Sequence, residues 1–145
     1  MIHDRAITIT VGRSRRDTQW RAQATTVAEL WERLRTPARS SETMEQYLAL
    51  TKAQQDDLKD VGGYVAGTLA GTRRKAGAVT GRDIVTLDLD SIPAGAAEQV
   101  CSRVESLGCG YCIYSTRKHR PGSPRLRGAL PQDHTAAADG YGPRA

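Results

Sequence analysis

The stretch Asp83-Ile-Val-Thr-Leu-Asp-Leu-Asp90 decides the fold, because it is the clearest strand in the chain. Its bulky apolar residues occupy alternate positions: Val85, Leu87 and Leu89. Since successive side chains of a strand point to opposite faces, these three share one face, while Thr86, Asp88 and Asp90 share the other. The stretch therefore predicts a half-buried strand with an acidic face.

The residues that follow predict one helix and two more strands. Apolar residues recur at helical spacing before Gly108, which is placed for a left-handed C-cap: Ala97, Val100, Val104 and Leu107. Strands are predicted at Tyr111–Ser115 and Leu126–Leu130. This strand-helix-strand-strand order over residues 84–130 predicts an α+β fold with a small sheet and helices mostly on one face.

The N-terminal half adds a strand and two helices to this prediction. Residues 7–11 alternate as a strand does, and Thr26 with Glu29 forms a capping box for an apolar helix. A second helix is predicted from about Thr43, and the glycine-rich stretch 62–81 is predicted to be mostly a flexible loop. We expect both tryptophans to be packing anchors.

Composition limits the class of protein. The chain has 145 residues and a formal net charge of +5, enough for one domain, which we place at residues 1–131 with a poorly structured tail at 132–145. No apolar run is long enough to span a membrane, and the N-terminus does not resemble a signal peptide. Three cysteines predict reduced thiols and a cytoplasmic location, with Cys109 and Cys112 packed in the core.

Asp88 and Asp90 are the first candidate site. Residues two apart on a strand lie on the same face, with Cα atoms about 6.6 Å apart. Two neighbouring carboxylates resist joint ionisation unless a cation lies between them, and oxygen ligands suit Mg²⁺ or Mn²⁺. The alternative is that both residues lie on a solvated strand face.

Two basic segments are candidate phosphate sites, with a solvated surface loop as the alternative. Between Gly110 and Pro131 there is no acidic residue, but there are six basic or imidazole side chains: Arg117, Lys118, His119, Arg120, Arg125 and Arg127. The glycine-rich loop carries four more basic residues: Arg73, Arg74, Lys75 and Arg82. If the strands holding Asp88 and Ser115 are neighbours, the acidic and basic groups meet at one end of the sheet.

The runs VTLDLDSIPAG (residues 85–95) and LGCGYCIYSTRKHRPGSPRLRGALP (residues 107–131) carry a resemblance to a known family. They resemble the primase-polymerase domain of the archaeo-eukaryotic primase superfamily, closest to phage and mobile-element proteins of the virulence-associated E or primase-helicase type. Residues 7–20, 29–50 and 59–83 are similar to the same group. The resemblance therefore extends over nearly the whole chain.

The resemblance implies an RRM-like sheet core and a metal-dependent nucleotidyltransferase site. It implies that Asp88 and Asp90 hold Mg²⁺ or Mn²⁺, and that Ser115 and His119 form a second motif against the incoming nucleotide. The Ser–His spacing is looser than in the superfamily, because Arg117 occupies the usual histidine position. Nucleoside triphosphate and template contacts are further implied for Arg117, Lys118, Arg125 and Arg127, with Arg73, Arg74, Lys75 and Arg82 along the nucleic acid.

The sequence also departs from the superfamily, because no third acidic motif follows on a later strand. We therefore expect the front part of a primase-polymerase, acting on nucleoside triphosphates and a single-stranded DNA template, with a helicase domain as a candidate partner in the full-length protein. The alternative is a catalytically incomplete nucleotide- or nucleic-acid-binding module. A glycosyltransferase using the Asp88-x-Asp90 pair is disfavoured, because such enzymes usually need a larger domain.

Overall fold

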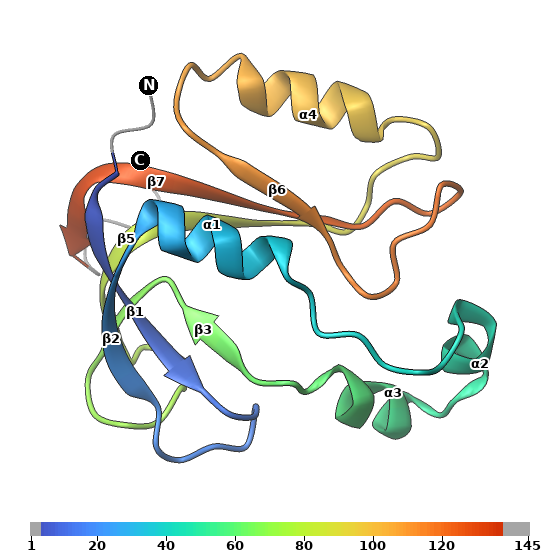
Figure 1. The fold of residues 1–145 in the computed structure, drawn as a ribbon, viewed down its shortest axis with the longest axis horizontal. Coiled ribbons are helices and arrows are strands. Elements are labelled where there is room, and N and C mark those ends of the chain that lie inside the picture. Colours follow the sequence, from blue (N-terminus) through green and yellow to red (C-terminus); the bar gives the residue numbers. More distant parts are fainter. Residues whose placement is uncertain (1–3, 138–145) are drawn as a thin grey trace.

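The computed structural model describes residues 4–137, which form an α+β fold with two antiparallel sheets (Figure 1). The α+β class predicted from the sequence is confirmed. In chain order the elements are β1 (Ala6–Gly12), β2 (Arg21–Thr26), α1 (Val27–Arg35), α2 (Met44–Ala49), α3 (Lys52–Lys59), β3 (Gly63–Val65), β4 (Gly67–Leu69), β5 (Val79–Leu89), α4 (Ala97–Glu105), β6 (Cys112–Ser115) and β7 (Leu126–Ala137).

One short segment joins the two sheets, whose strand orders are β2-β1-β3 and β4-β5-β7-β6. Only Ala66 separates β3 from β4, so the chain passes from one sheet directly into the other. The Thr10 hydroxyl of β1 donates to the Gly67 carbonyl of β4 at 2.7 Å and closes the junction. A Cβ at Gly67 would lie 1.8 Å from the Gly81 carbonyl oxygen, so only glycine allows β4 to approach β5 this closely. The glycine-rich stretch predicted to be mostly loop thus supplies two strands.

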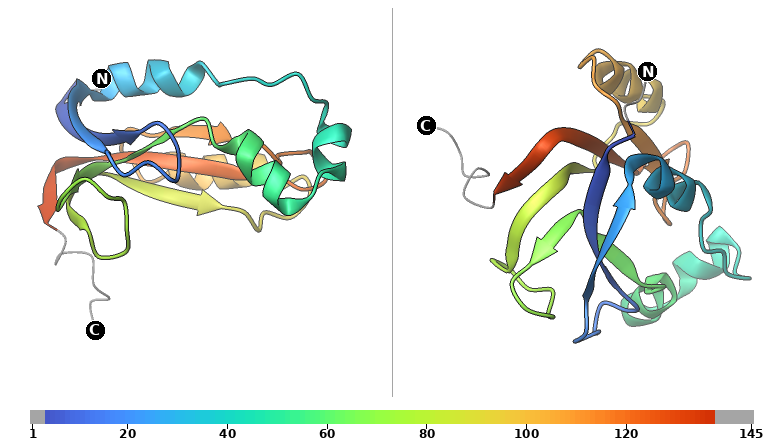
Figure 2. Two further views of the ribbon diagram at one scale, coloured as in Figure 1. Left: turned by 90° about the horizontal axis from the view of Figure 1, so that it is seen from below. Right: turned by 60° about the vertical axis from the view of Figure 1, so that its left-hand side comes forward.

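The hydrophobic core lies between α1 and the inner face of this strongly curved arrangement of strands (Figure 2). Its buried members come from both sheets and from α1: Ile7, Ile9, Val27, Leu30, Trp31, Ala66, Ile84 and Ala129. Trp20 and Trp31 are both buried, as predicted. The capping box of Thr26 and Glu29 at the start of α1 is confirmed.

Both faces of the β4-β5-β7-β6 sheet are covered, which the alternation in β5 did not predict. Ile84 shares a face with Thr86 and Asp88 and is fully buried, whereas Leu87 on the opposite face is half-buried. Helix α1 lies on the inner face and α4 on the outer face (Figures 1 and 2). Helix α4 therefore covers the face opposite to the one that α1 covers.

The predicted strand-helix-strand-strand order of residues 84–130 is confirmed as β5-α4-β6-β7, with Gly108 at a φ of 68° after α4. The strands of Asp88 and Ser115 are not neighbours, however, because β7 lies between β5 and β6. Strand β7 also continues to Ala137, beyond the predicted end at Leu130. The rest of the predicted tail, residues 138–145, lies outside the described residues.

The structure also tests the predictions that the cysteines are reduced and packed in the core and that the chain has no membrane span. All three thiols are free, and Cys112 packs against the core, where burial raises its thiol pKa. Cys109 is exposed, so the prediction that it packs in the core is wrong. Within residues 4–137 no helix is both long and apolar enough to cross a membrane.

A buried carboxylate ties the two sheets together. Asp83 of β5 is 4% exposed, and its side chain accepts hydrogen bonds from the Thr8 backbone N–H of β1 at 2.8 Å and from Arg5 Nη2 at 3.0 Å. The Thr135 hydroxyl of β7 also donates to it. Burial alone would raise the pKa of Asp83, but these hydrogen bonds and the Arg5 charge outweigh it and hold the pKa below its ordinary value.

We predict that Asp83→Ala lowers the free energy of unfolding by about 3–5 kcal/mol, because it leaves three donors without their acceptor. Asp133→Ala removes the same charge at an exposed position of β7 and should change the free energy of unfolding by less than about 0.5 kcal/mol. Urea denaturation of both variants measures the difference. A loss for Asp83→Ala no larger than the control's would contradict this role.

The contribution of Asp83 should depend on pH. Because its folded-state pKa is lowered, its stabilisation is complete above the unfolded pKa of about 3.9 and is lost as the pH falls through the folded value. The stability gap between wild type and Asp83→Ala should therefore narrow below about pH 4.

Candidate functional site

Three neighbouring strands place a carboxylate, a guanidinium and a phenol side by side on the inner face of the sheet. Asp88 of β5 is in register with Arg127 of β7, which is in register with Tyr114 of β6. Directly paired residues of antiparallel strands share a face. Arg127 Nε and Nη2 each lie 2.7 Å from Asp88 Oδ1. This row lies two residues along the strands from the row of Thr86, Ala129 and Cys112.

A second carboxylate and a second arginine continue the same face past the end of β5. Arg125 Nη1 lies 3.8 Å from Asp90 Oδ2, and the Thr116 N–H donates to the Arg125 carbonyl at 3.1 Å. The side chains of Asp88 and Asp90 are 67% and 56% exposed. They border an open hollow of about 320 Å³ together with residues 89, 91 and 92. Both acidic groups are thus accessible to a ligand.

Strand order differs from the expectation, yet the acidic and basic groups still meet. Because β5 and β6 both run antiparallel to β7, they are parallel to each other and end at the same edge of the sheet. The loop between β6 and β7, residues 116–125, therefore starts beside the end of β5. The two strands need not be adjacent for this meeting to occur.

The arginines occupy the electrostatic role that the sequence analysis gave to a metal ion. Each carboxylate has a guanidinium partner, which relieves the repulsion between Asp88 and Asp90. Burial acts to lower the pKa of Arg127, but the hydrogen bond and charge of Asp88, aided by Tyr114, raise it overall. Arg127 is therefore held firmly in its charged form.

The donor set fits a hard divalent cation that keeps part of its own shell. Asp88 and Asp90 offer exposed carboxylate oxygens from one face of a strand, as Mg²⁺ or Mn²⁺ bound through one or two carboxylates requires. Among residues 4–137 no group of three or more histidine, cysteine or acidic side chains is placed around a metal position. Water and phosphate oxygens would have to complete the coordination.

The β6–β7 loop positions His119 beside this site. Its ring Nδ1 accepts the backbone N–H of Arg125 at 3.2 Å, and the His119 backbone N–H donates to the Thr116 carbonyl at 2.9 Å. In the neutral ring this leaves the proton on Nε2, which can donate to a ligand. His119 thus fixes the backbone from which the Arg125 side chain projects.

Other predicted nucleotide contacts are placed differently. Ser115 pairs with Leu126 in the row of Leu89, so its side chain lies on the face opposite Asp88. Arg117 lies 3.7 Å from Glu42 and over the Tyr47 ring, 4.6 Å from its centroid, and so anchors the loop to α2. Lys118 lies in the same loop and is half-buried.

Tyr64 of β3 is a neighbour of the site that the sequence pattern did not predict. Burial raises its pKa, and the charge and hydroxyl of Tyr114 raise it further. The positive charge of Arg127 acts in the opposite direction on the Tyr64 pKa, and Tyr114 helps to raise the pKa of Arg127, so both phenols lie close enough to interact with this end of the sheet. The glycines around Tyr64 concealed β3 from pattern analysis.

The second predicted basic segment lies at the other end of β5. Asp88 is nine residues beyond Val79, which corresponds to about 30 Å of extended strand. Arg73, Arg74 and Lys75 are exposed in the loop before Val79. Arg82 is half-buried within β5 and does not belong to that loop.

Trp20 joins this loop to the β1–β2 hairpin. The Trp20 backbone N–H donates to the Thr72 carbonyl at 2.8 Å, and the Arg74 guanidinium lies 5.5 Å from the centre of the indole ring. A Cβ at Gly12 would lie 2.3 Å from the indole, so the ring packs directly on the hairpin backbone. The two loops therefore form one end of the molecule.

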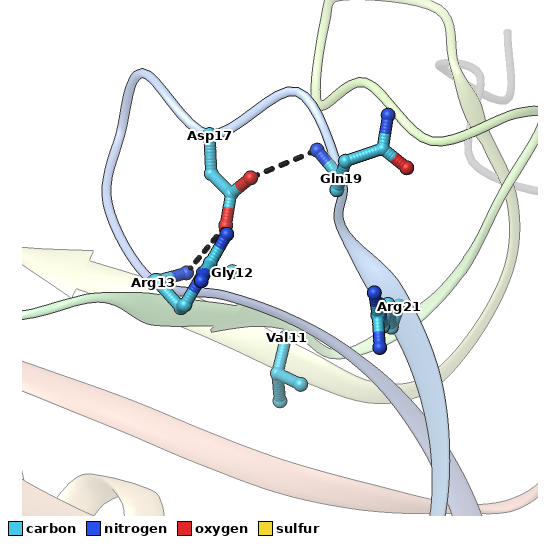
Figure 3. Close-up of a pocket in the computed structure, with 6 residues that line it drawn as sticks. All are labelled: Val11, Gly12, Arg13, Asp17, Gln19 and Arg21. Carbon is cyan, nitrogen blue, oxygen red and sulfur yellow. Dashed lines mark hydrogen bonds and ion pairs between the residues drawn. The ribbon is translucent and has the colours of Figure 1, made fainter.

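The hairpin contributes a hollow of about 250 Å³ to this end (Figure 3). Arg13 and Arg21 line it, together with Asp17, whose carboxylate accepts the N–H groups of Arg13 and Gln19 at 3.0 and 2.8 Å. These backbone hydrogen bonds lower the pKa of Asp17, and the one from Arg13 has the larger effect. The sequence pattern did not predict this role for Arg13 or Arg21.

These features define an α+β domain with a carboxylate–arginine site at one end of its long strands and a basic surface at the other. The model of the VapE N-terminal domain family matches residues 1–145, and the chain belongs to that family. This agrees with the resemblance to virulence-associated E proteins and with a phage or plasmid context. No curated protein and no solved structure shows significant similarity to the chain.

We predict that His119→Ala lowers the free energy of unfolding by about 1 kcal/mol, since the Arg125 N–H loses its acceptor. His119→Asn, whose side-chain oxygen can replace Nδ1, should recover most of this loss. Thermal denaturation compares the variants. Equal stability of wild type and His119→Ala would show that this hydrogen bond does not hold the loop.

Proposed function

We propose that this chain is the N-terminal portion of a phage- or plasmid-type primase-polymerase that binds a nucleoside triphosphate together with Mg²⁺ or Mn²⁺. The observation that carries the proposal is the pairing of Asp88 with Arg127 of β7 and of Asp90 with Arg125 of the β6–β7 loop, where the two carboxylates border an open hollow. Carboxylates that hold a cation beside arginines that hold phosphate are the elements of a nucleotidyltransfer site.

Each side chain has a distinct role in this proposal. Asp88 and Asp90 would hold the cation, which would supply charge stabilisation for phosphoryl transfer. Arg125 and Arg127 bind phosphate oxygens through their planar forks, and His119 Nε2 donates to the same group. Ser115, on the opposite face, is left out of the contacts.

We predict that Asp88→Asn and Asp90→Asn each reduce Mn²⁺-dependent binding of a nucleoside triphosphate at least tenfold, because one anionic ligand is lost. Asp133→Asn is the matched control, since it removes the same charge about 20 Å along β7 from Arg127. Isothermal titration with a non-hydrolysable triphosphate measures binding. Wild-type metal dependence in both site variants would exclude the assignment.

A second candidate function is a nucleic-acid-binding module without catalysis. The missing third acidic ligand within residues 4–137 favours it, as does the basic end formed by Arg13, Arg21, Arg73, Arg74 and Lys75. Cationic groups at this end would neutralise the phosphates of a single strand. Such a strand must cover about 30 Å to reach Asp88 from this end.

We predict that the chain binds single-stranded DNA with an affinity that falls steeply with salt. The triple variant Arg73→Gln/Arg74→Gln/Lys75→Gln should make the slope of log K against log salt shallower by about two, at about 0.7 per phosphate contact. Fluorescence anisotropy at several salt concentrations measures both. An unchanged slope would show that the loop does not contact the DNA. Labelled product in primer extension with Mn²⁺ would exclude a purely binding role for the chain.

A further inference from the structure

The ion pairs at the candidate site lead to a statement about how its ligands bind. Arg127 is bonded to Asp88, and Arg125 lies beside Asp90, so the groups assigned to phosphate are already engaged by the groups assigned to the cation. Both pairs are accessible, with the arginine side chains 45% and 38% exposed. Exposed ion pairs of this kind are weak enough to exchange partners.

We propose that Arg127, assisted by Arg125, is an exchangeable counter-ion, an inference that rests on the proposed function. In the free protein Arg127 neutralises Asp88. When metal and triphosphate bind together, its guanidinium moves from Asp88 to the phosphates. The arginine therefore couples the two ligands. Neither ligand alone satisfies all the charges at the site, whereas the metal–triphosphate complex provides a cation for the carboxylates and anions for the arginines.

Electrostatics explains why each ligand binds poorly alone. A divalent cation bound to the Asp88 carboxylate would lie within about 5 Å of the guanidinium, and like charges at that distance repel. A triphosphate without metal would have to take Arg127 from Asp88 and would lie beside two unpaired carboxylates. Binding both ligands removes both penalties.

The setting of Arg127 allows the exchange without moving the backbone. Its backbone is held in the middle of the sheet by pairing on both sides, with Asp88 on β5 and Tyr114 on β6. Only the side chain must swing between the carboxylate and a ligand in the hollow. Tyr114, which pairs with Arg127 on β6, borders it on the side away from Asp88.

The first test measures the binding of Mn²⁺ in the absence of triphosphate, using the electron paramagnetic resonance signal of the free ion. Arg127→Gln should bind Mn²⁺ about fivefold more tightly than wild type, because the competing charge is gone. Arg103→Gln, which removes the same charge from an exposed position in the last turn of α4, should change the affinity less than twofold. Arg127→Lys keeps the charge and should retain most of the suppression.

The second test measures a non-hydrolysable nucleoside triphosphate in the presence of EDTA. Asp88→Asn releases Arg127 and removes a repelling charge, so it should bind the metal-free triphosphate at least threefold more tightly than wild type. Asp133→Asn should not. Circular dichroism melts confirm that each variant is folded. With both ligands present, the gain in Mn²⁺ affinity caused by triphosphate should be smaller in Arg127→Gln than in wild type.

These outcomes separate the counter-ion proposal from the proposed function. If Arg127→Gln and wild type bind Mn²⁺ equally, the counter-ion role is overturned even where the metal–triphosphate complex binds well. If wild type binds no metal–triphosphate complex but Arg127→Gln gains Mn²⁺ binding, the proposed function fails while the competition between Arg127 and a cation is supported.

Discussion

The buried carboxylate of Asp83 is the interaction on which the rest of the structure depends. It accepts hydrogen bonds from β1, from β7 and from Arg5, and so binds together sheets that share few backbone hydrogen bonds. A charged group that is nearly fully buried is stable only when its hydrogen bonds are satisfied. The curved arrangement of strands around α1 follows from this junction and from the close approach of β4 to β5.

That arrangement determines where charge can lie. Near Asp83 the inner face of the sheet is covered by α1 and carries apolar residues, whereas toward the end of β5 the same face opens to solvent and carries Asp88, Arg127 and Tyr114. At the open end each carboxylate has an arginine partner, so the negative charge of Asp88 and Asp90 is compensated. A ligand that binds there must exchange charges with the site, which is the basis of the proposed coupling between metal and triphosphate.

The length of β5 separates the candidate nucleotide site from the basic loop that the resemblance places along the nucleic acid. The carboxylate–arginine site and the basic end around Trp20 lie about 30 Å apart along one strand. The family match agrees with the resemblance to virulence-associated E proteins, and both surfaces suit anionic ligands. A nucleotide at one end and a strand of nucleic acid running from the other is a geometry that this separation permits.

Local patterns in the sequence determined the α+β class, the order β5-α4-β6-β7, the capping box of α1 and the burial of both tryptophans, because alternation, helical spacing and capping act over a few residues. They also located Asp88, Asp90 and the basic loop. Only the tertiary structure decided that β7 lies between β5 and β6, that Ser115 faces away from Asp88, and that each carboxylate has an arginine partner. Strand order and register depend on contacts between residues far apart in the chain. Strands β3 and β4 are short and each begins with glycine, which has no side chain to contribute to an alternating pattern.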